Sequence, residues 1–307
     1  MNDIIYQELN NLSLTQDNAF KAKAFKNAAN VVKKINKDIV SIDDVKGVKG
    51  IGKSTIEKIA IILDTGGLPE SASQNSKNLF IQELTQIYGV GIKKAKELVK
   101  VISSFEELES NKDELLNAKQ LIGLKHYKDL LLRIPRNEMD SHNKIITKIW
   151  ANNKFSKTFE IVGSYRRNKM DSGDIDILVT FPKNSPKQFK LLIQQLVDAN
   201  YLVDNLAWGP KKYMGVCRLE NGLSRRIDII YCSKEEYPFC LLYFTGSGEY
   251  NRSMREHANI LGFKLNEKSL EKTDETKAKI VFKTEKEIFD FLKIPYLEPQ
   301  DRTVFKM

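Results

Sequence analysis

The first third of the chain carries apolar residues at helical spacing. In residues 19–36 apolar side chains recur every three or four positions, which predicts a helix with one buried face. Shorter segments of the same kind continue to about Leu68, and residues 79–133 repeat the pattern. Residues 69–77, PESASQNSK, have no apolar periodicity and indicate a linker. The pattern predicts two helical units joined by a polar segment.

From Thr158 onward the pattern becomes that of strands. FEIVG, DIDILVTF, MGVCRL and RRIDIIYC alternate or run apolar, and a helix beginning at Lys187 separates two of them. Further helices are expected near 235–244, 249–261 and 285–293, with short strands at 262–265 and 279–282. The chain is therefore predicted to be α+β, with a helical N-terminal third before a mixed remainder.

Composition and charge narrow the class of protein. The net charge is +9, from 49 Lys and Arg against 40 Asp and Glu, which mildly favours a polyanionic partner such as nucleic acid. Cys217, Cys232 and Cys240 form no C-x-x-C pair, so we expect small buried hydrophobes in a reducing compartment rather than a zinc site or disulfides. The N-terminus lacks signal-peptide features and no apolar run reaches membrane-spanning length, so we expect an intracellular protein that does not contact membranes.

Two glycine turns form an internal repeat. Gly50-Ile51-Gly52 opens the predicted helix KSTIEKIAIIL, and Gly89-Val90-Gly91 opens IKKAKELVKVI. The glycines allow a sharp turn, and the helix behind each turn presents backbone N–H groups that suit a phosphate. Each copy resembles the helix–hairpin–helix unit, which grips the DNA backbone without reading sequence.

Residues 47–54, GVKGIGKS, also satisfy the P-loop pattern. A P-loop follows a buried strand, whereas the preceding SIDDVK has no hydrophobic strand pattern and the region is predicted to be helical. The second glycine turn lacks the Lys-Ser pair. We therefore interpret the glycines as structural and exclude a Walker-type ATPase.

The strongest chemical signal is GSYRR at 163–167 followed by Asp174 and Asp176. In a strand, residues two apart face the same side about 7 Å apart, so the two aspartates point together while Ile175 and Ile177 pack inward. Asp228 lies in a second strand that could run beside the first. Three such carboxylates can hold two divalent metal ions for phosphoryl displacement.

An isolated D-x-D is more often a solvated strand edge, and G-S-x-R-R alone could cap a helix. Together they resemble the nucleotidyltransferase superfamily, with Ser164, Arg167 and backbone N–H groups cradling phosphates. This motif alone leaves DNA, RNA, tRNA or a small molecule open as the acceptor.

The rest of the chain resembles the family X DNA polymerases, those of the DNA polymerase beta type in particular. The resemblance rests on LYFTGS (242–247) with Asn251 and Arg255, and on IGLKHY (122–127), RIPRNEM (133–139), YMGVCRL (213–219) and EPQDR (298–302). It implies two Mg²⁺ ions, or Mn²⁺, held by Asp174, Asp176 and Asp228 as the catalytic metal ligands.

The resemblance also implies the ligand contacts. For the incoming nucleotide they are Ser164, Arg167 and Gly173 at the triphosphate, Tyr243, Phe244 and Gly246 at the deoxyribose, and Asn251 at the base. For DNA they are Arg255 at the template strand, Arg226 and Lys212, and the hairpin glycines Gly50, Gly52, Gly89 and Gly91, whose turns are candidate sites for Na⁺ or K⁺. One departure is Gly248, where the family pattern has an acid.

The N-terminal region resembles the family's small lyase domain, which removes a 5′-deoxyribose phosphate through a Schiff base. Lys58 falls on the position of the nucleophile, and Lys53 and Lys21 are candidate phosphate contacts. The sequence departs from that domain by Phe20 for a His, Phe25 for a Tyr and Ser54 for a Lys. A lysine on a solvated helix face is the alternative for Lys58.

With the resemblance, the predicted domains are a lyase-like domain (1–69), a linker (70–78), a DNA-binding helical subdomain (79–135), a catalytic palm (136–233) and a C-terminal subdomain that binds the nascent base pair (234–307). The predicted function is template-directed gap filling in base excision repair with a 5′-deoxyribose phosphate lyase. The expected partners are gapped or nicked duplex DNA and dNTPs, with the chain acting as a monomer. The alternatives are a template-independent nucleotidyltransferase and a non-catalytic helix–hairpin–helix scaffold.

Overall fold

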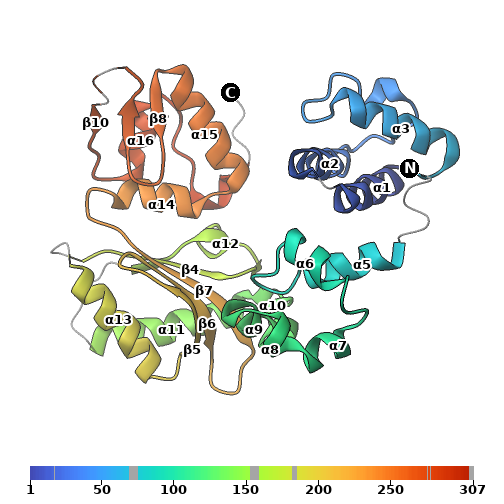
Figure 1. The fold of residues 1–307 in the computed structure, drawn as a ribbon. Coiled ribbons are helices and arrows are strands. Elements are labelled where there is room, and N and C mark those ends of the chain that lie inside the picture. The colour runs from blue at the N-terminus through green and yellow to red at the C-terminus, as the bar shows by residue number, and fades with distance from the viewer. Residues whose placement is uncertain are drawn as a thin grey trace. The chain divides into compact units, whose positions relative to one another are not determined.

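The structure is a computed structural model that describes residues 1–303 except 17, 69–74, 153–158, 182–184, 275 and 277. It divides into two compact units, Met1–Lys125 and His126–Met307. The described part of the first unit contains helices and turns, and the second combines helices with sheets (Figure 1). The predicted α+β class is confirmed, while the finer domain boundaries stay predictions.

The first unit begins with three helices around a core of small and aliphatic side chains. Ile5 and Leu9 of α1, Ala28 and Val32 of α2, and Ile59 of α3 are all fully buried. The predicted helix at 19–36 begins after Asn18, whose side chain accepts hydrogen bonds from two backbone N–H groups. The elements of this unit are α1 (Asn2–Thr15), α2 (Ala19–Val32), the 3₁₀ helix η1 (Ile42–Asp44), α3 (Lys53–Thr65), α5 (Asn75–Leu84), α6 (Ile92–Leu98), α7 (Phe105–Ser110), α8 (Lys112–Leu115) and α9 (Ala118–Lys125).

The two glycine turns have the same backbone geometry, which confirms the repeat. Gly50 and Gly89 have φ of 99° and 85°, values that favour glycine. Gly52 and Gly91 then cap α3 and α6 with φ, ψ of −88°, 171° and −85°, 169°. Each turn therefore feeds a helix N-terminus in the same way.

The segment before the first glycine turn decides the P-loop question. It forms η1, closed by a capping box between Ser41 and Asp44, instead of a buried strand. The P-loop interpretation is therefore excluded by the fold. Of the predicted linker at 70–78, residues 70–74 lie outside the described residues, and residues 75–78 belong to α5.

The second unit is built on a five-stranded sheet in the order β2-β4-β7-β6-β5. β4 and β7 pair in parallel, and the other neighbours are antiparallel. Helices α11 and α13 lie together on one face of this sheet (Figure 1). The elements of this part are α10 (Tyr127–Leu130), β1 (Ile134–Pro135), α11 (Arg136–Asn152), β2 (Phe159–Ile161), α12 (Gly163–Arg166), β3 (Asp171–Ser172), β4 (Ile175–Val179), α13 (Pro186–Asp198), β5 (Leu202–Trp208), β6 (Lys212–Arg218) and β7 (Ser224–Tyr231).

The core below the sheet explains why these strands form. Ile175 and Ile177 of β4 are buried, as predicted, against Ile227 and Ile229 of β7 and the apolar side of α11 and α13. α13 begins at Pro186 after Ser185, whose side chain caps the helix. The three cysteines are buried and free, which confirms their interpretation as small core residues.

The C-terminal part packs a three-stranded antiparallel sheet, in the order β10-β9-β8, with three helices. Its core includes the buried Tyr250, Phe289 and Leu292. Within the described residues, no helix is long and apolar enough to cross a membrane. The elements are α14 (Tyr237–Thr245), α15 (Gly248–Ile260), β8 (Phe263–Leu265), β9 (Leu270–Lys272), β10 (Lys279–Ile280), α16 (Glu285–Phe291) and the 3₁₀ helix η2 (Pro299–Asp301).

Candidate active site

The aspartate pair at the centre of the sheet is set by strand register. β4 and β7 run in parallel, and Asp176 stands directly opposite Asp228. The flanking isoleucines point into the core below, so both carboxylates lie on the other face. Asp174 immediately precedes β4. The predicted pairing of the two acid-bearing strands is confirmed.

Two basic side chains hold two of the three aspartates. The Arg226 guanidinium lies 2.5 Å from Asp174 and 3.3 Å from Asp228, and the Lys212 ammonium lies 3.0 Å from Asp228. Arg226 therefore bridges two carboxylates that would otherwise repel each other. The DNA contacts predicted at Arg226 and Lys212 thus coincide in space with the predicted metal ligands.

The Asp176 carboxyl group is buried beside two other acids, and this raises its pKa. Burial, and then the negative charges of Asp174 and Asp228, raise its pKa from 3.8 to about 7, against the opposing influence of Arg226 and Lys212. A carboxyl group in this state gains most from a cation placed beside it.

Three carboxylates on one sheet face are the hard oxygen donors that Mg²⁺ prefers. Asp228 Oδ1 is buried and accepts no hydrogen bond, and its charge is balanced by the Arg226 guanidinium at 3.3 Å. As the side chains stand, the described residues contain no group of three Asp, Glu, His or Cys that could hold a metal ion. The chemistry of these oxygen atoms therefore fits a divalent metal ion, and Arg226 and Lys212 are the cations paired with two of the three carboxylates in this structure.

The G-S turn reaches the aspartates from the neighbouring element. Gly163 has φ of 62°, and a Cβ at this position would lie 2.9 Å from Asp176 Oδ2. Only glycine therefore lets α12 approach the carboxylate this closely. Ser164 donates a hydrogen bond to Ser172 at 2.8 Å, and Arg167 donates one to the Thr245 carbonyl at 2.5 Å.

The segment predicted to contact the nucleotide sugar lies at the C-terminal end of α14. Tyr243 and Phe244 pack edge to face with ring centroids 5.2 Å apart, and both are half-buried. Asn251 on α15 donates a hydrogen bond to the Tyr243 carbonyl at 2.6 Å, and Arg255 lies one turn further along that helix. Gly246 has φ of 68°.

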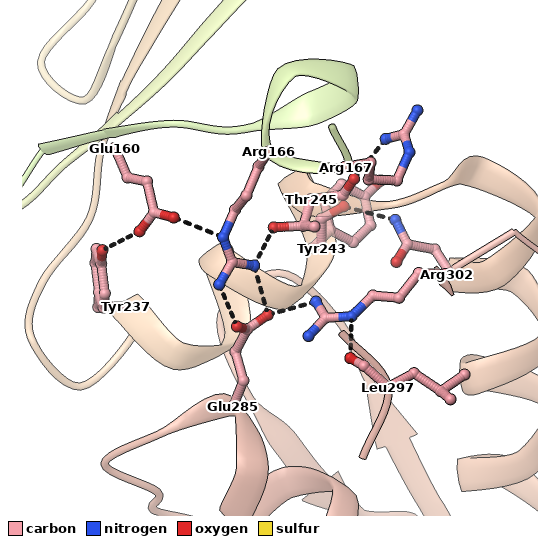
Figure 2. Close-up of polar contacts among 10 residues, drawn as sticks. Glu160, Arg166, Arg167, Tyr237, Tyr243, Thr245, Glu285, Leu297 and Arg302 are labelled. Atoms are coloured by element: carbon pink, nitrogen blue, oxygen red, sulfur yellow. Dashed lines mark hydrogen bonds and ion pairs between the residues drawn. The ribbon is translucent and has the colours of Figure 1, made fainter. Parts of the chain in front are cut away.

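Figure 2 shows an ion-pair network beside this segment that the sequence did not reveal. Arg166 of α12 pairs with Glu160 at 2.6 Å and with Glu285 of α16 at 2.7 Å, and it donates a hydrogen bond to Thr245. Arg302 pairs with the other oxygen of Glu285 at 2.7 Å. Arg166 thereby ties the turn that carries Ser164 and Arg167 to the C-terminal part. Arg166 and Arg302 lie in the motifs GSYRR and EPQDR on which the resemblance rests, but the sequence did not indicate that both pair with Glu285.

The residues predicted for the lyase gather in one pocket of the first unit. A cavity of about 540 Å³ is lined by Lys58, Lys53 and Lys21 together with the hairpin glycines Gly50 and Gly52. Two of the family departures, Phe25 and Ser54, line the same cavity. Phe20, the third, is not among the lining residues and is 87% exposed.

Family models match four consecutive segments of the chain. They are a helix-hairpin-helix domain at residues 2–68, the fingers domain of DNA polymerase lambda at 82–131, the DNA polymerase beta palm at 133–234 and the DNA polymerase beta thumb at 240–303. The palm match contains all three aspartates and the G-S turn.

Curated relatives agree with this division. The chain is 32% identical to DNA polymerase lambda of Rattus norvegicus over 94% of its length and 31% identical to that of Arabidopsis thaliana over 89%. It is 24% identical to DNA nucleotidylexotransferase of Ambystoma mexicanum over 94%. The chain spans 53% and 56% of the two lambda polymerases and 65% of the third relative. With its palm aspartates, hairpin repeat and matched segments, the chain belongs to family X of the DNA polymerases, the DNA polymerase beta-like family.

Proposed function

We propose that the chain is a template-directed DNA polymerase that fills short gaps by two-metal nucleotidyl transfer. The observation that carries this is the parallel register that sets Asp176 opposite Asp228, with Asp174 beside them. These residues would hold two Mg²⁺ ions, which supply charge neutralisation at the triphosphate and a more acidic primer hydroxyl.

The basic side chains around the aspartates would have one role in the protein alone and another when DNA is bound. Arg226 and Lys212 compensate Asp174 and Asp228 in the protein alone. When duplex DNA binds, its phosphates offer these cations stronger partners, and the carboxylate oxygens become available to the metal ions. Binding of primer and of metal would therefore favour each other.

The nucleotide contacts follow from the turn and from α14. Ser164, Arg167 and the backbone of Gly173 would bind the triphosphate, and the Tyr243–Gly246 segment would lie against the deoxyribose. Arg167 and Asn251 bond to backbone carbonyls of this segment in the protein alone. When a nucleotide binds, both side chains would give up their hydrogen bonds to these carbonyls and bond to the nucleotide instead.

We further propose that the first unit removes 5′-deoxyribose phosphate. The Lys58 amine would attack the sugar aldehyde and release water to form a Schiff base, and β-elimination would then break the carbon–oxygen bond to the DNA phosphate. Three lysines around one cavity support this, because Lys53 and Lys21 can hold the sugar's own phosphate while Lys58 reacts. The hairpin glycines would present backbone N–H groups, with or without Na⁺ or K⁺, to the DNA strand.

The deciding experiment is extension of a primer in one-nucleotide-gapped DNA with a 5′-phosphate and Mg²⁺. We expect incorporation of the nucleotide complementary to the template, and loss of at least about two orders of magnitude in rate for Asp228→Ala with DNA binding retained. Incorporation that ignores the template base would favour a template-independent transferase instead. Full DNA binding without incorporation by the unmodified chain would favour a non-catalytic scaffold.

Intracellular repair of DNA by a monomer is the setting that we propose for this activity. Three free, buried cysteines and a DNA substrate are consistent with a reducing compartment.

A further inference from the structure

A slot on the helix-covered face of the five-stranded sheet has no part in the site described above. It lies where the turn between β5 and β6 meets the first turn of α13, and its volume is about 560 Å³. The side chains that line it are Pro186, Lys187, Phe189, Lys190, Trp208 and Pro210.

Strand register places this slot on the opposite side of the sheet from the aspartates. Trp208 pairs with Tyr213 across β5 and β6, and Tyr213 pairs with Ile229 across β6 and β7. Directly opposed residues share a face, so Trp208 lies on the side of Ile229, which is buried under the helices. Asp228, the neighbour of Ile229, faces the other way. DNA held at the aspartates would leave this slot open.

The apolar part of the slot is preformed. Trp208 is 40% exposed, while its ring packs edge to face on the buried Tyr213 with centroids 6.1 Å apart. Pro186 and Pro210 are both exposed, and their fixed φ angles hold the two walls. A partly exposed tryptophan ring held between two prolines is a suitable contact surface for one large apolar side chain of a ligand.

The rim of the slot is positively charged. Lys187 and Lys190 are exposed, lie one turn apart, and stand at the N-terminus of a 13-residue helix, which adds partial positive charge. Within the part of the chain that the structure describes, no carboxylate is among the residues that line the slot. An anionic ligand would therefore meet two lysines and no carboxylate in the lining of the slot.

We propose that this slot binds a short acidic peptide segment of a partner protein. One aromatic or large aliphatic side chain would sit against Trp208, and flanking carboxylates would pair with Lys187 and Lys190. The volume suits one or two side chains, so the partner contributes a short linear motif and not a folded surface of standard interface size. Nucleic acid fits less well, because the slot faces away from the aspartates. This interaction is separate from the proposed polymerase activity.

The test is selection of short random peptides on phage against the full chain, with counter-selection against Lys187→Glu/Lys190→Glu. We expect enriched peptides that combine Asp or Glu with one large apolar residue. A labelled consensus peptide should bind the lysine variant, and Trp208→Ala, at least about tenfold more weakly. Leu191→Ala is the matched control, since Leu191 is 50% exposed on the same helix but does not line the slot.

A direct signal for occupancy is available. The chain has two tryptophans, and Trp150 is only 3% exposed, so iodide quenching reports on Trp208, and the peptide should protect it. Unfolding curves check that each variant is folded, and primer extension should be unchanged in all three. The proposal is overturned if enriched peptides lack acids, if the consensus peptide binds Trp208→Ala as well as the unmodified chain, or if a short oligo-thymidine displaces the peptide and binds more tightly.

Discussion

Replacing Glu285 with glutamine should destabilise the second unit strongly. The Glu285 side chain is 5% exposed and accepts hydrogen bonds from two arginines, of which Arg302 is fully buried and Arg166 is 15% exposed. One Arg302 nitrogen, Nη2, already lacks a hydrogen-bond partner. Glutamine keeps the shape but removes the charge. It leaves the fully buried Arg302 without its carboxylate partner and leaves Arg166 with Glu160 alone. Removing one partner of a buried ion pair costs about 3–5 kcal/mol, which is the loss we expect in the free energy of unfolding.

Glu160→Gln provides the matched control. Glu160 bonds to the same Arg166 at 2.6 Å, but its side chain is 38% exposed, so water screens the pair and the expected loss is about 0–1 kcal/mol. Urea unfolding followed by circular dichroism would measure both variants against the unmodified chain at the same pH. Hydrogen exchange in α16 should accelerate for Glu285→Gln alone. Equal losses for the two variants, or a loss below about 1 kcal/mol for Glu285→Gln, would refute the assignment of this acid as the buried counter-ion.

Three other predictions address the sites and pH. Lys58→Ala should lose borohydride trapping on 5′-deoxyribose phosphate DNA yet still extend a primer; trapping at the unmodified level would move the nucleophile to another lysine. Burial lowers the pKa of His142 from 6.5 to about 4, so its contribution to stability is complete above pH 6.5 and is lost as the pH falls towards 4, by about 3 kcal/mol. His142→Gln should therefore show a smaller acid destabilisation in unfolding curves over that range, and an unchanged pH dependence would contradict this. Because Asp176 has a pKa of about 7, Mg²⁺ must displace its proton at lower pH, so calorimetric Mg²⁺ affinity should rise from pH 6 to 8, and a flat profile would argue against Asp176 as a ligand.

The centre of the site could be predicted from the sequence because burial and chemistry agree there. Ile175, Ile177 and Ile229 require one face of each strand to be buried, which leaves the aspartates only the other face. Two such strands pair most favourably side by side, and the structure has them adjacent. The glycine turns could be predicted for a similar reason, since positive φ restricts the residue type.

Other elements were missed where the periodic signal is weak. β5 contains polar residues and two register irregularities against β6, and such bulges disrupt the alternation by which a strand is recognised. α11 was not predicted, although its buried Met139, Ile146 and Trp150 form part of the core below the sheet. The bridge from Arg166 to Glu285 joins residues 119 positions apart, a separation at which one sequence gives no pairing signal.

The parallel pairing of β4 with β7 also makes the aspartate site depend on a contact between distant parts of the chain, so we expect it to be completed late in folding. Arg226 and Asp174 are 52 positions apart, and the chain between them contains α13, β5 and β6. Contacts of such long range are slow to form. A nascent chain that ends before β7 contains Asp174 and Asp176 but lacks Asp228, so its site is incomplete. Trp208 and the slot beside α13 belong to this intervening segment, so they too are complete only when β5, β6 and α13 have come together.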